Sequence, residues 1–167
     1  MIIYSNPTEL NQKLLRELFD YRNGSLYWKI KPAATVNVGD VVGYLSDRYY
    51  RCCILSKGYA IHRIIFLYHH GYLPEEVDHI NGITTDNRID NLRVSTRNEN
   101  IYNTKKPKSN TSGIKGVSWD KRQNRWVAYC SVGGKRFQIG YYKNLEDAEK
   151  VVREFREKHH GEFVNHG

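Results

Sequence analysis

The residues best suited to chemistry are the adjacent pair Asp78 and His79, with two amide side chains, Asn91 and Asn100, farther along the chain. A carboxylate is a hard oxygen ligand that suits Mg²⁺ or Mn²⁺, and a neutral imidazole accepts a proton near pH 7. A metal ligand beside a base supplies the two groups that activate a water molecule. The pair therefore predicts metal-assisted hydrolysis.

The surrounding elements must bring the distant amides close to this pair. An Asn-Gly turn signal follows His79 and favours positive φ, and residues 92–95 predict a short return strand. Thr96 and Glu99 form a capping box, which predicts a helix from Arg97 to about Thr104. Strand, loop, strand and helix in this order let Asn100 reach back toward Asp78. Ideal alternation sends Asp78 and His79 to opposite faces of a strand, so we expect the strand to end or twist there.

Three segments carry a resemblance to a known family: Asp78-His79-Ile80-Asn81-Gly82, residues 86–93, and Glu99-Asn100. They resemble the HNH endonuclease motif in its His-Asn-Asn form. The resemblance implies a ββα-metal (His-Me finger) fold with His79 as general base. It also implies that Asp78 and Asn100 hold one divalent cation, Mg²⁺ or Mn²⁺, and that Asn91 bonds to backbone and keeps the base oriented. Asn98 is a rival to Asn100 for the metal position.

Composition points to the same class of partner. The chain has 167 residues, a net charge of +8 and a pI near 9.4, which indicates a polyanionic partner and double-stranded DNA in particular. A membrane surface is the alternative, but no stretch approaches the roughly 18 apolar residues of a spanning helix. Residues 1–7 lack the pattern of a secretion signal. We therefore expect an intracellular protein, in the cytoplasm of a bacterial or phage-infected host.

The cysteines do not predict a metal site. Cys52, Cys53 and Cys130 include no Cys-x-x-Cys pair, so neither a disulfide framework nor a structural zinc is expected. We expect reduced cysteines in strands or in the core.

A small mixed lobe is predicted before the motif. Residues 8–20 place leucines at helical spacing, Asn23-Gly24 turns the chain into a strand at 25–29, and a hairpin is expected through 49–55. Residues 61–70 predict a helix that ends at Gly71. His62, within this helix, is expected to be structural or to contact phosphate.

The composition changes after Asn100. Residues 104–112 are polar and basic, which is typical of a linker. Three strands are predicted at 114–119, 125–132 and 135–141, followed by a helix that Asn144 and Asp147 cap and Gly161 ends. On the second strand Trp126 and Ala128 share one face, which the helix is expected to cover, while Arg125 and Tyr129 share the other.

This segment resembles the plant ethylene-response-factor (Apetala-type) DNA-binding domain through residues 112–117, Arg125-Trp126, Ile139-Gly140 and residues 146–148. The resemblance implies that the three-stranded sheet enters the major groove. Arg suits bidentate contact with guanine and Lys suits phosphate. The predicted DNA contacts are Lys115, Arg122, Arg125, Tyr129, Lys135 and Arg136. Plant members commonly place Arg or Trp where this chain has Ser118, Ser131 and Gln138, so their sequence preference is not transferred.

The predicted fold is α+β, with a nuclease module and its N-terminal lobe over residues 1–103, a basic linker over 104–112 and a DNA-binding domain over 113–167. The predicted function is DNA endonuclease of the phage or homing type. The alternative is a catalytically inactive DNA-binding protein on an HNH fold, and RNA binding without cleavage is a third, weaker hypothesis. A monomer or weak dimer is expected. One chain carries one predicted active site, so a monomer predicts a nick, and a double-strand break would require a dimer or two sequential events.

Overall fold

The chain divides into two compact units, Met1–Val94 and Ser95–Gly167. The structure is a computed structural model that describes residues 9–167, so Thr8 and the N-terminal residues used to exclude a secretion signal lie outside the described part. Each unit has its own hydrophobic core. None of the helices in residues 9–167 is long and apolar enough to cross a membrane.

The first unit is a mixed α and β structure built from short elements. Its described strands form the antiparallel hairpin β1–β2, the antiparallel sheet β3–β4–β5, and the pair β6–β7 that carries the predicted nuclease motif. The elements in chain order are α1 (Gln12–Leu18), β1 (Phe19–Arg22), β2 (Ser25–Trp28), β3 (Tyr44–Ser46), β4 (Tyr49–Ile54), β5 (Lys57–Ala60), α2 (Ile61–His70), β6 (Glu76–His79), the 3₁₀ helix η1 (Ile89–Asn91) and β7 (Leu92–Ser95).

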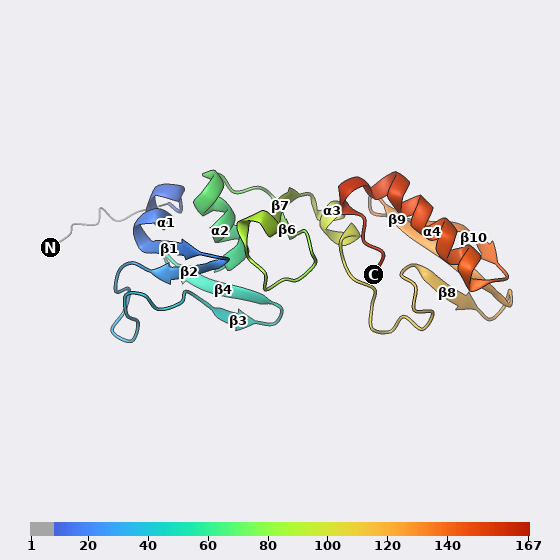
Figure 1. Cartoon of the computed structure of the whole chain (residues 1–167), viewed down its shortest axis with the longest axis horizontal. Coiled ribbons are helices and arrows are strands. Elements are labelled where there is room, and N and C mark those ends of the chain that lie inside the picture. Colours follow the sequence, from blue (N-terminus) through green and yellow to red (C-terminus); the bar gives the residue numbers. More distant parts are fainter. Residues whose placement is uncertain (1–8) are drawn as a thin grey trace. The chain divides into compact units, whose positions relative to one another are not determined.

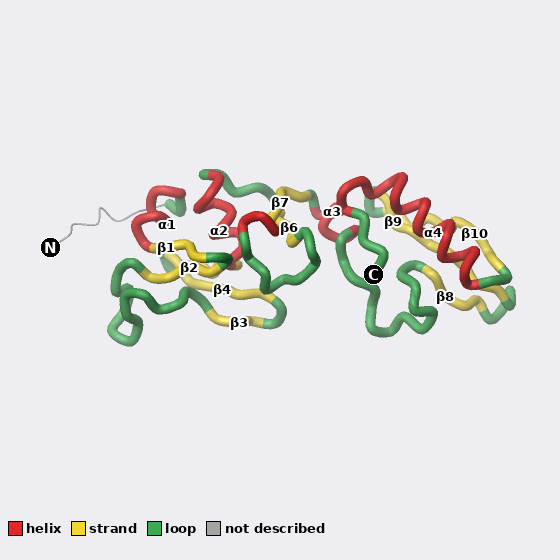
Figure 2. Tube along the Cα trace, viewed as in Figure 1, coloured by secondary structure: helices red, strands yellow, loops and turns green. Residues whose placement is uncertain are grey.

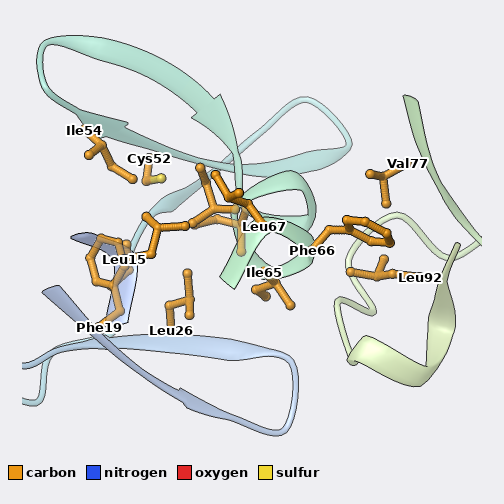
Figure 3. Packing of buried hydrophobic residues seen from close by; sticks show 13 residues of the cluster. Leu15, Phe19, Leu26, Cys52, Ile54, Ile65, Phe66, Leu67, Val77 and Leu92 are labelled. Carbon is orange, nitrogen blue, oxygen red and sulfur yellow. The ribbon is translucent and has the colours of Figure 1, made fainter. Parts of the chain in front are cut away.

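Helix α2 is the centre of the first unit. Ile64 and Ile65 are fully buried, and the chain leaves the helix through Gly71 in the left-handed conformation, with its N–H on the Leu67 carbonyl. Figure 3 shows Phe66 beside a buried residue from each of the strands β6 and β7. The predicted helix and its glycine stop are therefore confirmed, and the motif strands are fixed to the core through α2.

The predicted N-terminal helix was too long. In the structure, helix α1 ends at Leu18, and Phe19 begins β1. The reason is the turn at Asn23-Gly24, where both residues have positive φ. This turn reverses the chain and places Phe19 opposite Trp28 in the hairpin. The two rings lie 4.7 Å apart, edge to face. Cross-strand aromatic packing outweighed helical spacing at this end.

The second unit is an antiparallel three-stranded sheet covered by one long helix, as Figure 1 shows for α4 along β8, β9 and β10. Ala128, Ala148 and Val152 are fully buried where helix and sheet meet. The elements are α3 (Arg97–Tyr102), β8 (Val117–Asp120), β9 (Arg125–Val132), β10 (Lys135–Tyr142), α4 (Leu145–His160) and the 3₁₀ helix η2 (Gly161–Phe163). The segment between α3 and β8 is a loop (Figure 2).

Two local predictions in this unit needed correction. The first strand starts at Val117 rather than at residue 114, because Gly116 has positive φ and a turn bonds the Val117 N–H to the Ile114 carbonyl. Asn144 occupies the N-cap position of α4, but its side chain donates to the Asp147 carboxylate at 3.3 Å instead of bonding to the helix backbone.

Candidate active site and nucleic-acid interface

His79 is the last residue of β6 and is 4% exposed. Its Nε2 lies 2.9 Å from the Asn87 side-chain oxygen, which is also buried. On α2, the His62 ring stands 4.9 Å from the His79 ring in an edge-on arrangement. The imidazole is thus held by a hydrogen bond and by packing, as a base of fixed orientation requires.

His62 is a buried, uncharged neighbour of this imidazole. Burial, followed by the influence of His79 and Arg63, lowers the pKa of His62 to about 3. It also packs against the Tyr49 ring at 5.4 Å. Burial and these ring contacts favour a structural role, which is one of the two expected for His62.

Asp78 is 5% exposed and lies beside Arg93 of β7. The Arg93 guanidinium donates from Nε and Nη2 to the Asp78 Oδ2, at 3.0 and 2.9 Å. The strand ends directly after Asp78 and His79, and their side chains reach different neighbours, Arg93 for the first and Asn87 for the second. The expected strand end is therefore confirmed, and the approach of both side chains to one phosphate stays a prediction.

Asn91 bonds to backbone on both sides of the loop that joins β6 to β7. Its side-chain oxygen accepts from the Asn81 N–H at 3.0 Å, and its amide nitrogen donates to the Asp86 carbonyl at 2.7 Å. These contacts agree with the bonding to backbone that the family resemblance implies for Asn91. The catalytic role of Asn91 stays a prediction.

The same loop contains an internal ion pair between Arg88 and Asp86. Arg88 donates to both oxygens of the Asp86 carboxylate, at 2.8 and 2.7 Å, and Asn81 donates to one of them. Hydrogen bonds from Arg88 are the main reason why the pKa of Asp86 lies well below its usual value. The loop that supplies Asn87 and Asn91 is therefore tied internally.

Asn100 and its rival Asn98 lie on α3, in the second unit. The capping box that predicted this helix is present: Thr96 Oγ1 accepts from the Glu99 N–H, and the Glu99 carboxylate accepts from the Thr96 N–H at 2.7 Å. Asp78 belongs to the first unit and Asn100 to the second, and their pairing around one metal stays a prediction.

The donor types at these positions suit a hard divalent cation. A carboxylate oxygen and an amide oxygen are the ligands that Mg²⁺ and Mn²⁺ prefer, and a carboxylate has more acceptor capacity than one guanidinium uses. Residues 9–167 contain no cluster of three or more His, Cys, Asp or Glu side chains arranged around a cation.

The sheet of the second unit has one face away from α4, and its register identifies the residues there. Residues directly opposite in antiparallel strands share a face, and Tyr129 lies opposite Gln138 while Ser131 lies opposite Arg136. The Arg136 guanidinium carbon sits 3.9 Å from the centre of the Tyr129 ring. Arg136, Tyr129 and Arg125 are therefore on this open face, as are all three positions that depart from the plant pattern, Ser118, Ser131 and Gln138.

The other three predicted DNA contacts have different surroundings. Lys135 lies opposite Val132, which gives it the register of the helix-covered face, although its side chain is exposed. Arg122 is exposed in the β8–β9 turn. Lys115 is half-buried and its ammonium donates to backbone carbonyls, while burial lowers its pKa to about 8. The DNA contacts of all three stay predictions.

Comparison with known proteins identifies the same two modules. The chain matches the HNH endonuclease family over residues 59–102 and the AP2 domain over residues 112–162. It is 40% identical to Protein 3.8 of Escherichia phage T7 over 88 residues, which is 53% of this chain and 72% of that protein. The chain belongs to the phage HNH endonucleases. It also carries an AP2-like DNA-binding domain, and no solved structure matches it.

Sequence reasoning on this HNH endonuclease missed two partnerships. It placed both Asn87 and Arg93 in the motif segment 86–93 without a role, and it placed Arg93 in the return strand as well. A carboxamide eight residues after the predicted base and an arginine on the paired strand were the available signals. Neither signal reveals the residue that Asn87 or Arg93 contacts, because each contact depends on the path of the loop.

Proposed function

We propose that this protein is a phage-encoded, homing-type DNA endonuclease that hydrolyses phosphodiester bonds with one divalent cation and a histidine general base. The observation that carries the proposal is the buried His79 imidazole, fixed through Nε2 on Asn87 and adjacent to Asp78 in the family motif. The proposed arrangement is the ββα-metal fold, with β6, β7 and α3 as its elements.

His79 is the proposed base. An amide oxygen accepts but does not donate, so the Asn87 contact favours the tautomer with the proton on Nε2. The basic lone pair then lies on Nδ1, and we assign to it the removal of a proton from the attacking water. Asn91 holds the loop that places Asn87 beside the base.

Asp78 and Asn100 are the residues that would hold the cation. When bound, it would act as a Lewis acid on the phosphate oxygens that gain negative charge. Arg93 holds the buried Asp78 carboxylate in place through its two hydrogen bonds.

The open face of the AP2 sheet is the proposed surface for double-stranded DNA. Arg136 and Arg125 supply the positive charge there, and the Tyr129 ring beneath Arg136 restricts its guanidinium. A net charge of +8 supports association with the phosphate backbone.

The test is cleavage of supercoiled plasmids in Mg²⁺ or Mn²⁺ by wild-type protein, His79→Ala and the control His70→Ala, which removes an exposed histidine of the same unit. We expect wild type and control to convert plasmid to open circle, and a chelator to stop both. His79→Ala should bind DNA normally in a gel shift and leave the plasmid intact. Nicking is the expected product of a monomer.

The alternative is an inactive DNA-binding protein, which the pairing of Asp78 with Arg93 favours because it offers the carboxylate a partner other than a metal. If all three proteins bind a varied panel of DNA and none cuts it with either metal, the alternative holds and the nuclease proposal fails.

A further inference from the structure

Tyr102, the last residue of α3, is built into the core of the second unit. It is 9% exposed, and its ring lies flat on the His160 ring at the end of α4, with centroids 3.9 Å apart and planes 4° from parallel. Its hydroxyl oxygen accepts a hydrogen bond of 2.5 Å from the Gly133 N–H in the β9–β10 turn. One residue thus joins α3 to both layers of the AP2 domain.

Lys115 secures the same end of α3. Its ammonium donates to the carbonyls of Tyr102 at 2.8 Å, of Thr104, and of Asn165 at 3.1 Å. The carbonyl end of a helix attracts positive charge. The backbone of Lys115 is in turn held by the buried Arg156 guanidinium, which donates to its carbonyl.

Asn165 completes the connection from the C-terminal segment. Its amide nitrogen donates to the Asn103 carbonyl at 2.7 Å and to the Asn103 side-chain oxygen at 3.1 Å. In Figure 1 this end of the chain runs beside α3 and the loop that follows it. We call Tyr102, Lys115, His160 and Asn165 the α3 anchor.

A helix as short as α3 is not stable by itself in water, so its conformation depends on what it packs against. The HNH match runs to residue 102 and includes α3, yet α3 folds as part of the unit that contains the AP2 domain. The last element of the nuclease motif is therefore held by the DNA-binding module.

We propose that Lys115 and Tyr102 are positioning residues for the nuclease reaction, which act through α3 on Asn100. The inference rests on the proposed function and assigns Lys115 a role other than contact with DNA. It couples the two modules: the AP2 domain binds the substrate and also fixes the helix that presents the proposed metal ligand.

The test compares wild-type full-length protein with Lys115→Met, Tyr102→Phe and the control Lys121→Met, which removes an exposed lysine of the β8–β9 turn. We expect Lys115→Met to lower kcat for plasmid nicking at least tenfold. Its DNA Kd and the salt dependence of binding should match those of Lys121→Met. Tyr102→Phe, which keeps the ring stack and loses only the bond to Gly133, should show a smaller loss of kcat.

Amide hydrogen exchange supplies a readout that needs no cleavage. In Lys115→Met the α3 amides should exchange at least tenfold faster, while the β9 and β10 amides keep their protection. Unchanged kcat, or unchanged α3 exchange, would overturn the proposal. So would a weaker Kd with a reduced salt dependence and normal kcat, since that result marks a phosphate contact. If wild type itself does not cut, the proposed nuclease function fails, and the exchange rates still decide whether Lys115 anchors α3.

Discussion

Arg93 donates two hydrogen bonds to a single oxygen of Asp78, from Nε at 3.0 Å and from Nη2 at 2.9 Å. Both side chains are mostly buried, with 14% and 6% of their surfaces exposed. A buried carboxylate needs a compensating positive charge. Arg93 supplies it in this structure, and a bound cation is proposed to share that role.

Replacing Arg93 with Met should lower the free energy of unfolding by about 3 kcal/mol, because Asp78 is left buried without its partner. Urea denaturation measures this. The matched control is Arg22→Met, whose pair with Asp20 is exposed and should change stability by less than about 1 kcal/mol. Added Mg²⁺ should restore part of the loss in Arg93→Met. Equal losses in the two variants would contradict the assigned role of Arg93.

The acceptor at Asn87 should control the pH dependence of cleavage. In Asn87→Asp a carboxylate faces Nε2 and stabilises the protonated imidazole of His79, so the acid limb of the kcat profile should move to higher pH. Asn87→Ala should lower kcat about tenfold through loss of one oriented hydrogen bond. Exposed Asn37→Asp serves as control. A profile that moves equally in Asn37→Asp would rule out the specific role of Asn87.

Stability should increase with pH between about 3 and 6.5 because of His62. Its pKa in the folded protein is lowered to about 3, mainly by burial, and the unfolded value is about 6.5. The unfolded chain therefore takes up the proton first on acidification, and the folded state loses stability as pH falls through this window. His62→Phe should reduce the slope of unfolding free energy against pH by up to about 1.4 kcal/mol per unit. If the slope in His62→Phe equals that of wild type and of the control His70→Phe, His62 is not the source of this pH dependence.

Neighbouring positive residues on β10 should differ in their effect on DNA binding. Arg136 faces the open side of the sheet and Lys135 takes the register of the helix-covered side. Arg136→Ala should weaken specific binding by about 1–3 kcal/mol, measured by fluorescence anisotropy at several salt concentrations. Lys135→Ala removes the same charge and should cost clearly less. A larger loss for Lys135→Ala would mean that the other face of the sheet meets DNA.

Sequence predicted the parts of this molecule that depend on local signals. The capping box at Thr96 and Glu99, the helix that stops at Gly71 and the strand over residues 125–132 were all confirmed. The boundary near Leu18 was misplaced because pairing across the hairpin overrode helical spacing.

The sequence predicted which residues form the candidate site but not which side chains they contact. Its motif residues follow a fixed spacing, whereas the contacts of Arg93 with Asp78 and of Asn87 with His79 arise only when β7 and the loop fold back. The role of Lys115 was hidden for the same reason, since two of its carbonyl partners lie 11 and 50 residues away. Long-range contacts of this kind leave no periodic pattern in the chain.

The α3 anchor also has a consequence for exchange of modules, in evolution or in the laboratory. A chimaera that joins this HNH module to a foreign binding domain at residue 103 would separate α3 from the side chains that hold it, whereas the structural units part between Val94 and Ser95. Recombination that retargets such a protein would therefore need to carry α3 with the AP2 domain. A transferable DNA-binding unit would then begin inside the HNH motif, before its last helix.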